Sequence, residues 1–272
     1  MSAGTLAAIA STLAAYGLGS VSGALLVGRL RGGVDIRMLG SGNAGGTNAL
    51  RTQGPWFALG VIVIDLGKGW LAAAWLPLAA ARFGASALGL PEACAFAAML
   101  GHVWPLWHGF RGGKGAATLV GALLALAPVA LAVVLGVWFV AVIAFGFVGL
   151  ASMVAATALP LYVMAAGVEP IVPLGLFGVA AALLVIHTHR ANIVRMRAGT
   201  EPRARRLWLL GRGRGSARGP PGSARGDPRG AGLSPPGRRG FRVGAGARAG
   251  VRRDTECRVE SRARARERGR AH

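Results

Sequence analysis

Charged residues are scarce in this chain, and acidic residues are the scarcest among them. Asp, Glu, Lys and Arg make up only 15% of the 272 residues, whereas 53% are hydrophobic. This balance argues against a body surrounded by water and suits a protein embedded in a membrane. The 10 acidic residues stand against 31 Lys and Arg, which gives a formal net charge of +21.

The positive charge is concentrated near the C-terminal end. Residues 211–272 hold 17 arginines and 5 acidic residues, a net charge of +12, and are rich in Gly and Pro. They show no apolar periodicity, so we expect an integral membrane domain at residues 1–210 and a disordered basic tail at residues 211–272. Such a tail can bind anionic lipid or RNA. A frame-shifted or mispredicted C-terminus, which would not be native sequence, explains it at least as well.

Cysteine is rare as well. The two cysteines are Cys94, in an apolar segment, and Cys257, in the tail. Their positions match neither a disulfide framework nor a metal site. The sequence therefore predicts two unpaired thiols and no metal ligands.

Seven apolar segments are candidates for helices that cross a bilayer, which takes about 20 mostly apolar residues each. They cover residues 6–27, 56–80, 91–106, 116–128, 130–147, 150–166 and 171–188. The fourth is the weakest, because residues 117–150 can alternatively hold one long helix, giving six spans. We expect an all-α polytopic membrane protein with about seven transmembrane helices.

The cations define a topology. No Lys or Arg precedes the first apolar segment, so it does not resemble a secretory signal peptide. Cations follow the first, third and seventh segments, for example Arg29, Arg111 and Arg195. The positive-inside rule then places the N-terminus outside and these three loops, with the C-terminus, in the cytoplasm. With seven spans, the three loops that carry these cations all fall on the same side of the membrane, which favours seven spans over six.

Three polar inserts lie on this cytoplasmic face, at residues 40–51, 101–118 and 187–203. The second contains Arg111-Gly112-Gly113-Lys114-Gly115. Glycines let backbone N–H groups converge on an anion and the lysine adds a charge, so this run is typical of a phosphate cradle. It is not a nucleotide P-loop, because position 108 is not Gly and Gly115 replaces the required Ser or Thr. The alternative is a tight cytoplasmic turn.

The first insert offers hydrogen-bonding side chains beside one guanidinium. Its polar residues are Ser41, Asn43, Thr47, Asn48 and Arg51. Such a set suits a polyol phosphate, because hydroxyls need donors and acceptors and a phosphate suits the fork of an arginine. A helix cap explains one or two of these residues but not the whole group.

Four histidines and one pair of oppositely charged residues complete the set of candidate functional residues. His102 and His189 are candidate general bases, although a lone histidine is often only structural; His108 and His187 are weaker candidates. Asp65 and Lys68 lie inside the second apolar segment at a spacing that lets them pair on one helix face. Intramembrane charges are functional candidates, but a structural pair is favoured because the two neutralise each other.

Together, the three inserts resemble the motifs of the bacterial acyl-phosphate:glycerol-3-phosphate acyltransferase (PlsY) family. That family has S-x-N-x-G-x-T-N-x-x-R, then G-H-x-x-P running into G-G-K-G-x-A-T, then H-R-x-N-I-x-R followed by G-x-E. The matching residues are Ser41, Asn43, Gly45, Thr47, Asn48 and Arg51; Gly101, His102, Pro105, Gly112, Gly113, Lys114, Gly115, Ala117 and Thr118; and His189, Arg190, Asn192, Ile193, Arg195, Gly199 and Glu201. The resemblance covers roughly residues 5–206, and Arg111 stands where the family commonly has lysine.

This resemblance implies a seven-span inner-membrane enzyme whose active site faces the cytoplasm. The implied reaction transfers an acyl group from acyl phosphate to the sn-1 hydroxyl of glycerol 3-phosphate, giving lysophosphatidic acid and phosphate, the first step of phospholipid synthesis. Beyond these two substrates and membrane lipid, we expect no cofactor, no metal, no specific nucleic acid and no obligate protein partner. The alternative is a membrane transporter of phosphorylated metabolites, although the chain shows no internal repeat.

The chemistry needs no covalent nucleophile, since an acyl phosphate is already activated, and the sequence contains no convincing triad. The residues expected to act in catalysis are His102, Lys114 and His189, with His102, His189 or a substrate phosphate oxygen as the proton acceptor. The residues expected to bind or shape the substrate site are Ser41, Asn43, Thr47, Asn48, Arg51, Arg111, Gly112, Gly113, Gly115, Arg190, Asn192 and Glu201.

Overall fold

The computed structural model describes residues 1–86 and 88–204, and within them the chain is helical, with no β-strand. The ordered elements are α1 (Ala3–Gly19), α2 (Gly23–Leu30), η1 (Ile36–Met38), α3 (Gly46–Gln53), α4 (Pro55–Ala81), α5 (Leu90–Val103), η2 (Leu106–His108), α6 (Ala116–Leu126), α7 (Pro128–Phe145), α8 (Val148–Ala166), α9 (Ile171–Thr188) and α10 (Arg190–Arg197). The basic tail expected at residues 211–272 lies outside the described residues.

Each of the seven apolar segments contains a helix, and the all-α prediction is confirmed. The number of complete spans is a separate matter. Among the described residues, four helices are long and apolar enough to cross a bilayer, namely α4, α7, α8 and α9. The bent pair α1–α2 can be a fifth. With 14 residues in α5 and 11 in α6, seven transmembrane helices remain a prediction.

The first apolar segment is broken, so the prediction of one continuous helix over residues 6–27 is wrong. α1 and α2 meet at an angle of 47°. Ser20 ends α1, and Ser22 caps α2 by accepting a hydrogen bond from the N–H of Leu25 at 3.4 Å. Two serines close together can satisfy backbone groups that a break leaves without helical partners.

The alternative of a single helix over residues 117–150 is also wrong. Pro128 begins α7 at a first-turn position, where the missing N–H of a proline costs nothing. Gly146 ends the same helix with φ of +76°, a left-handed conformation that favours glycine. Local sequence therefore divides this apolar stretch into α6, α7 and α8.

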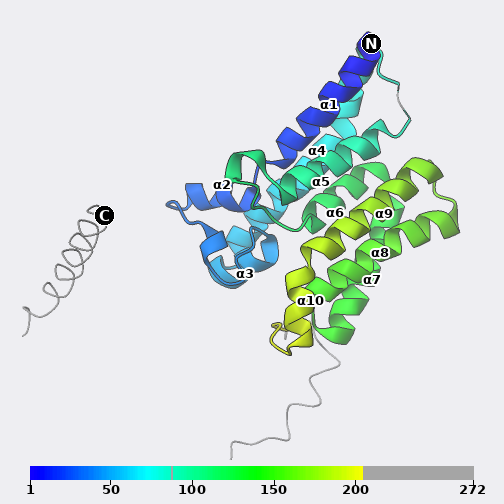
Figure 1. Ribbon diagram of the computed structural model, residues 1–272. Coiled ribbons are helices and arrows are strands. Elements are labelled where there is room, and N and C mark those ends of the chain that lie inside the picture. The colour runs from blue at the N-terminus through cyan, green and yellow to red at the C-terminus, as the bar shows by residue number, and fades with distance from the viewer. Residues whose placement is uncertain (87, 205–272) are drawn as a thin grey trace, which may run out of the picture. The chain divides into compact units, whose positions relative to one another are not determined.

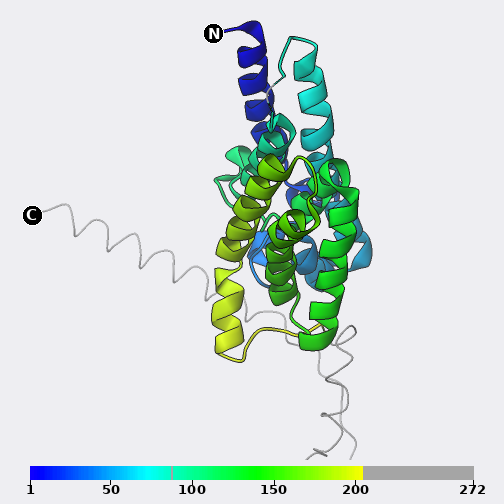
Figure 2. The same ribbon diagram turned by 90° about the vertical axis from the view of Figure 1, so that its right-hand side faces the viewer.

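Helices α1, α4, α5 and α6 pack together, and α7, α8 and α9 form a neighbouring layer (Figure 1). Figure 2 shows α1, in dark blue, lying beside the cyan end of α4. Small residues allow the close approach: a methyl group on Gly69 would meet the backbone of Thr118, and one on Gly121 would meet Leu66. Most of the buried hydrophobic residues belong to one cluster that extends from α5 and α6 to α9.

The outer faces of the long helices are apolar. Trp75 of α4, Leu161 of α8 and Leu183 of α9 each expose 62–66% of their surface. Exposed apolar faces on helices of spanning length belong in lipid, where the backbone is satisfied within each helix. The chain is therefore an integral membrane protein.

Candidate functional site

The glycine loop, residues 111–115, folds back onto the end of α5. The N–H of Gly112 donates to the carbonyl of Val103, and the N–H of Gly113 donates to that of His102, both at 3.1 Å. These bonds satisfy carbonyls that the end of a helix leaves unpaired. Both N–H groups therefore already have partners within the protein, and the binding of an anion by Gly112 and Gly113 stays a prediction.

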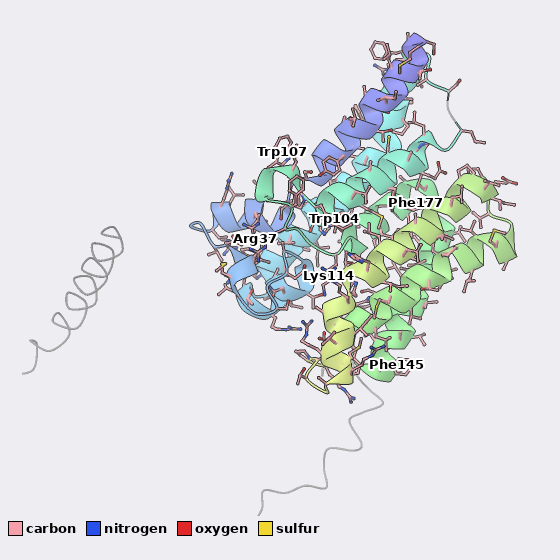
Figure 3. The ribbon with its side chains drawn as sticks, in the orientation of Figure 1. Arg37, Trp104, Trp107, Lys114, Phe145 and Phe177 are labelled. Carbon is pink, nitrogen blue, oxygen red and sulfur yellow. The ribbon has the colours of Figure 1, made fainter. Side chains whose placement is uncertain are left out.

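Lys114 lies where the second and third inserts meet (Figure 3). Its Nζ donates to Oδ1 of Asn192, and its carbonyl accepts from Oγ1 of Thr188 at 3.0 Å. Burial lowers the pKa of the ammonium to about 8; the positive charges of Arg195 and Arg51 act in the same direction, and Glu201 opposes them. A half-buried lysine beside other cations gives this region a net positive charge, which a bound anion would neutralise.

A chain of hydrogen bonds holds Asn192 in place. Its Nδ2 donates to Oε1 of Glu201 at 2.7 Å, and the other carboxylate oxygen of Glu201 accepts from Nε of Arg195 at 2.6 Å. The side chain of Asn192 lies directly against Gly149 of α8. We call Lys114, Asn192, Arg195 and Glu201 the lysine cluster. Because each polar atom is held by the next, the cluster is pre-organised.

His189 ends α9 beside this cluster. It is 4% exposed, and its Nδ1 donates to the carbonyl of Val185 at 2.7 Å, so the hydrogen sits on Nδ1 and Nε2 carries the lone pair. Burial, and then the charge of Lys114, lower its pKa to about 4. The imidazole is therefore neutral at physiological pH and can accept a hydrogen bond through Nε2.

Asn48 organises the first insert from inside. Its Nδ2 donates to the carbonyls of Ile36, Leu39 and Asn43, each at 3.0 Å, and its Oδ1 accepts from the N–H of Ser41 at 2.9 Å. Asn48 has only 2% of its surface exposed, and the donor and the acceptor of its side-chain amide both bond to the loop. This geometry indicates that Asn48 shapes the first insert.

The other residues of the first insert lie nearer the surface. The side chains of Ser41, Thr47 and Arg51 are exposed and that of Asn43 is half-buried. Arg51, in the last turn of α3, lies close enough for its charge to lower the pKa of Lys114. The first and third inserts thus contribute charges that act on Lys114 of the second.

Three expected site residues have partners outside the lysine cluster. Arg190 is exposed and donates from Nη1 to the carbonyl of His187 at 3.2 Å. The side chain of Arg111 is exposed, and its carbonyl accepts from Arg37 at 3.3 Å. His102 is 5% exposed and lies below the glycine loop, against Gly113. Gly115, in the left-handed conformation with φ of +86°, starts α6.

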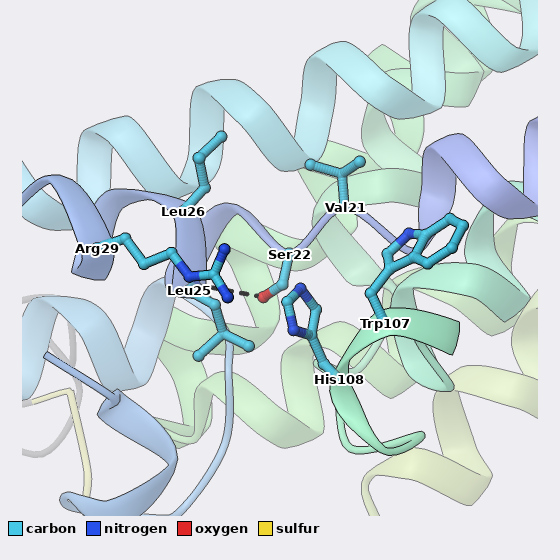
Figure 4. Close-up of a pocket in the computed structure, with 7 residues that line it drawn as sticks. All are labelled: Val21, Ser22, Leu25, Leu26, Arg29, Trp107 and His108. Carbon is cyan, nitrogen blue, oxygen red and sulfur yellow. Dashed lines mark hydrogen bonds between the residues drawn. The ribbon is translucent and has the colours of Figure 1, made fainter. Parts of the chain in front are cut away.

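A separate cavity of about 210 Å³ lies beside the break between α1 and α2 (Figure 4). Trp107 and His108 from η2 line it together with residues of α2, including Leu25 and Arg29. An adjoining hollow of about 200 Å³ reaches Asp35 and Arg37. Of the residues that the sequence analysis names as candidates, these hollows contain only the weaker candidate His108, so the site is defined by the lysine cluster and its neighbours.

Sequence reasoning left out some contributors. In the sequence pattern Arg195 is a topology signal and a motif match, and its spacing of three from Asn192 on one helix is the signal that joins it to the site. Thr188 and Gly149 gave no local signal, because their roles depend on which helix packs beside them.

The profile of a family described as "Glycerol-3-phosphate acyltransferase" matches residues 9–199. The chain belongs to the glycerol-3-phosphate acyltransferase family. A relative with that name from Synechococcus sp. (strain JA-3-3Ab) is 44% identical over 207 residues, covering 75% of this chain and 96% of the relative. One from Ralstonia nicotianae is 40% identical over 199 residues, covering 73% and 94%.

Solved structures of the family have the same fold. The crystal structure of PlsY, an integral membrane glycerol 3-phosphate acyltransferase, in its glycerol 3-phosphate form has a TM-score of 0.65 and 33% identity, covering 72% of this chain and 94% of that one. The lysophosphatidic acid form has the same TM-score and 32% identity, covering 75% and 98%. The predicted resemblance is confirmed, and the match ends before the basic tail.

Proposed function

We propose that this acyltransferase moves an acyl group from acyl phosphate to the sn-1 hydroxyl of glycerol 3-phosphate. The hydroxyl oxygen forms a bond to the acyl carbonyl carbon, the bond from that carbon to the phosphate oxygen breaks, and the hydroxyl proton leaves with the phosphate. The products are lysophosphatidic acid and inorganic phosphate. The observation that carries this proposal is the meeting of Lys114, His189 and Asn192 within a chain that belongs to this family.

Both substrates are anions, so their mutual repulsion opposes binding. Lys114, Arg51 and Arg195 supply positive charge from three inserts to offset it. Lys114 also stands just before the first turn of α6, whose N-terminal N–H groups carry partial positive charge. We infer that a substrate phosphate binds between Lys114 and this helix end, with Ser41 and Arg51 closing the other side.

For the proton, the relative basicity favours a substrate oxygen over a histidine. With a pKa of about 4, His189 is a weak base, whereas phosphate oxygens have a second pKa of about 6. We infer that the Nε2 lone pair of His189 accepts a hydrogen bond from the glycerol hydroxyl and orients it. Placing a hydroxyl against a carbonyl in this way can contribute roughly 7–11 kcal/mol to lowering the barrier.

The cytoplasmic face is the side we assign to the three inserts, with the N-terminus outside and the membrane being the bacterial inner membrane. Cations around the inserts support this orientation through the positive-inside rule. The exposed apolar faces of the helices offer the acyl chain a place at the lipid boundary, worth about 0.8 kcal/mol per buried methylene. A topology test with cysteine labelling of Arg31→Cys and Glu169→Cys in spheroplasts should label only the second from outside.

The decisive experiment is an acylation assay with purified protein in detergent. Acyl phosphate and glycerol 3-phosphate should give lysophosphatidic acid and inorganic phosphate in equal amounts, and acyl-CoA should give no product. Product from acyl-CoA alone would overturn the donor assignment. Uptake of glycerol 3-phosphate into vesicles without phosphate release would indicate a transporter instead.

A further inference from the structure

An ion pair is buried in the membrane domain behind the glycine loop. Nζ of Lys68 lies 2.9 Å from Oδ1 of Asp65, and both residues are on α4 with 3% and 1% of their surface exposed. Replacing a buried ion pair with apolar residues of the same size is often neutral or stabilising, so stability alone is a weak reason for its presence. Its contacts suggest a more specific role.

The pair holds the break between α1 and α2. Lys68 donates to the carbonyl of Val21 at 2.8 Å, and Asp65 accepts from the N–H of Gly23 at 3.2 Å. These two backbone groups flank the break, and inside a membrane domain an unsatisfied one costs several kcal/mol. The ions on α4 therefore fix the position of α2.

The same carboxylate faces the end of α5. Nδ1 of His102 lies 3.5 Å from Oδ1 of Asp65, which is longer than a good hydrogen bond but a close electrostatic contact. The other edge of the imidazole, at Nε2, lies directly against Gly113, where an added methyl group would collide with the ring. His102 therefore fills the space between the buried pair and the backbone of the glycine loop.

The next residue of that loop is Lys114, whose ammonium group donates to Asn192 of the lysine cluster. A continuous path of contacts thus runs from Asp65 through His102 and Gly113 to the ammonium group assigned to phosphate. A side chain enclosed in this way has no route to a substrate hydroxyl, because the loop covers it.

We propose that Asp65, Lys68 and His102 are positioning residues that set the glycine loop, and that His102 acts by contact with Gly113 and not by accepting a proton. This inference rests on the proposed acyltransferase function. It predicts that disturbing any of the three displaces Lys114 and weakens phosphate binding while leaving proton transfer intact.

A double-mutant cycle between His102→Ala and Gly113→Ala tests the contact, with KM for glycerol 3-phosphate, kcat and the pH profile measured on purified, monodisperse protein. Alone, Gly113→Ala should lower kcat/KM at least 10-fold, because its methyl group pushes the loop away from the ring. In the His102→Ala background, which leaves room for the methyl, the same change should cost at least fivefold less. His102→Ala itself should raise KM severalfold, keep kcat within about threefold and leave the shape of the pH profile unchanged.

Two further variants separate positioning from general destabilisation. Asp65→Asn keeps an oxygen for Gly23 but removes the charge that faces both His102 and Lys68, so it should raise KM as His102→Ala does, and the two effects should not multiply. Cys94→Ala alters another buried side chain of α5, which contacts Ser11 and Thr12 of α1, and should leave KM unchanged even if stability falls.

The proposal is overturned if the Gly113→Ala penalty is equal in both backgrounds, or if His102→Ala abolishes kcat and removes a limb of the pH profile. If His102→Ala does not fold, an unchanged KM in Asp65→Asn overturns it equally. A wild-type protein without acyltransferase activity would instead refute the proposed function.

Discussion

Replacing Lys114 with methionine removes one positive charge while keeping the length of the side chain. In the structure this ammonium is half-buried, donates to Asn192 and stands at the start of α6. A hydrogen bond from a charged group contributes about 1.5–3 kcal/mol. Losing one such bond to a substrate phosphate should therefore lower kcat/KM by roughly 10- to 150-fold.

We expect the Lys114→Met substitution to change the stability of the protein in a different direction from its activity. The pKa of Lys114 falls to about 8 in the folded protein from its usual value of 10.5, so folding disfavours its protonated form. The unfolded state binds more protons between these values, and stability therefore rises with pH across about 8 to 10.5. At neutral pH the methionine variant avoids this penalty, and its Tm should equal or exceed that of the wild type.

The assay measures phosphate release and lysophosphatidic acid formation at several concentrations of each substrate, beside thermal unfolding in the same detergent. Arg31→Met is the matched control, since Arg31 is an exposed cation at the end of α2. The control should retain wild-type kinetics. Survival of more than half of the wild-type kcat/KM in Lys114→Met would refute the assignment of this lysine to phosphate.

Three further predictions concern other parts of the site. Gly149→Ala should push the amide of Asn192 away and lower kcat/KM at least 10-fold, whereas Gly136→Ala, where a methyl group meets open space, should keep activity and gain about 0.5–1 kcal/mol of stability; equal kinetics in the two variants would contradict this. KM for glycerol 3-phosphate should rise as pH increases through about 8, where Lys114 loses its proton, and Lys114→Arg should remove that rise; a flat wild-type profile would count against the charge. Asn48→Asp keeps the acceptor but loses the donor to three carbonyls, so Tm should fall by several degrees; a Tm within one degree of wild type would show that the loop does not depend on it.

The contribution of the first insert shows how far a local pattern can be interpreted. Five polar side chains in residues 40–51 suggested a polyol phosphate site. In the structure, the side chain of Asn48 makes its hydrogen bonds within the loop itself. The charge of Arg51 acts on Lys114 and lowers its pKa. The sequence pattern does not distinguish a residue that builds a loop from one that faces a ligand, because both need the same polar atoms.

By itself the sequence determined the class and the family: apolar runs of helical length, cations on alternate loops and three ordered motifs depend on local composition and spacing. The helix ends at Pro128 and Gly146 also have local causes, although the sequence analysis left a single helix over residues 117–150 open. Only the tertiary structure decided which polar groups meet. The N–H groups of Gly112 and Gly113 are used by α5, and His102 lies beneath the loop because helices distant in sequence pack there. Contacts of that kind depend on the relative position of whole helices, which no local pattern encodes.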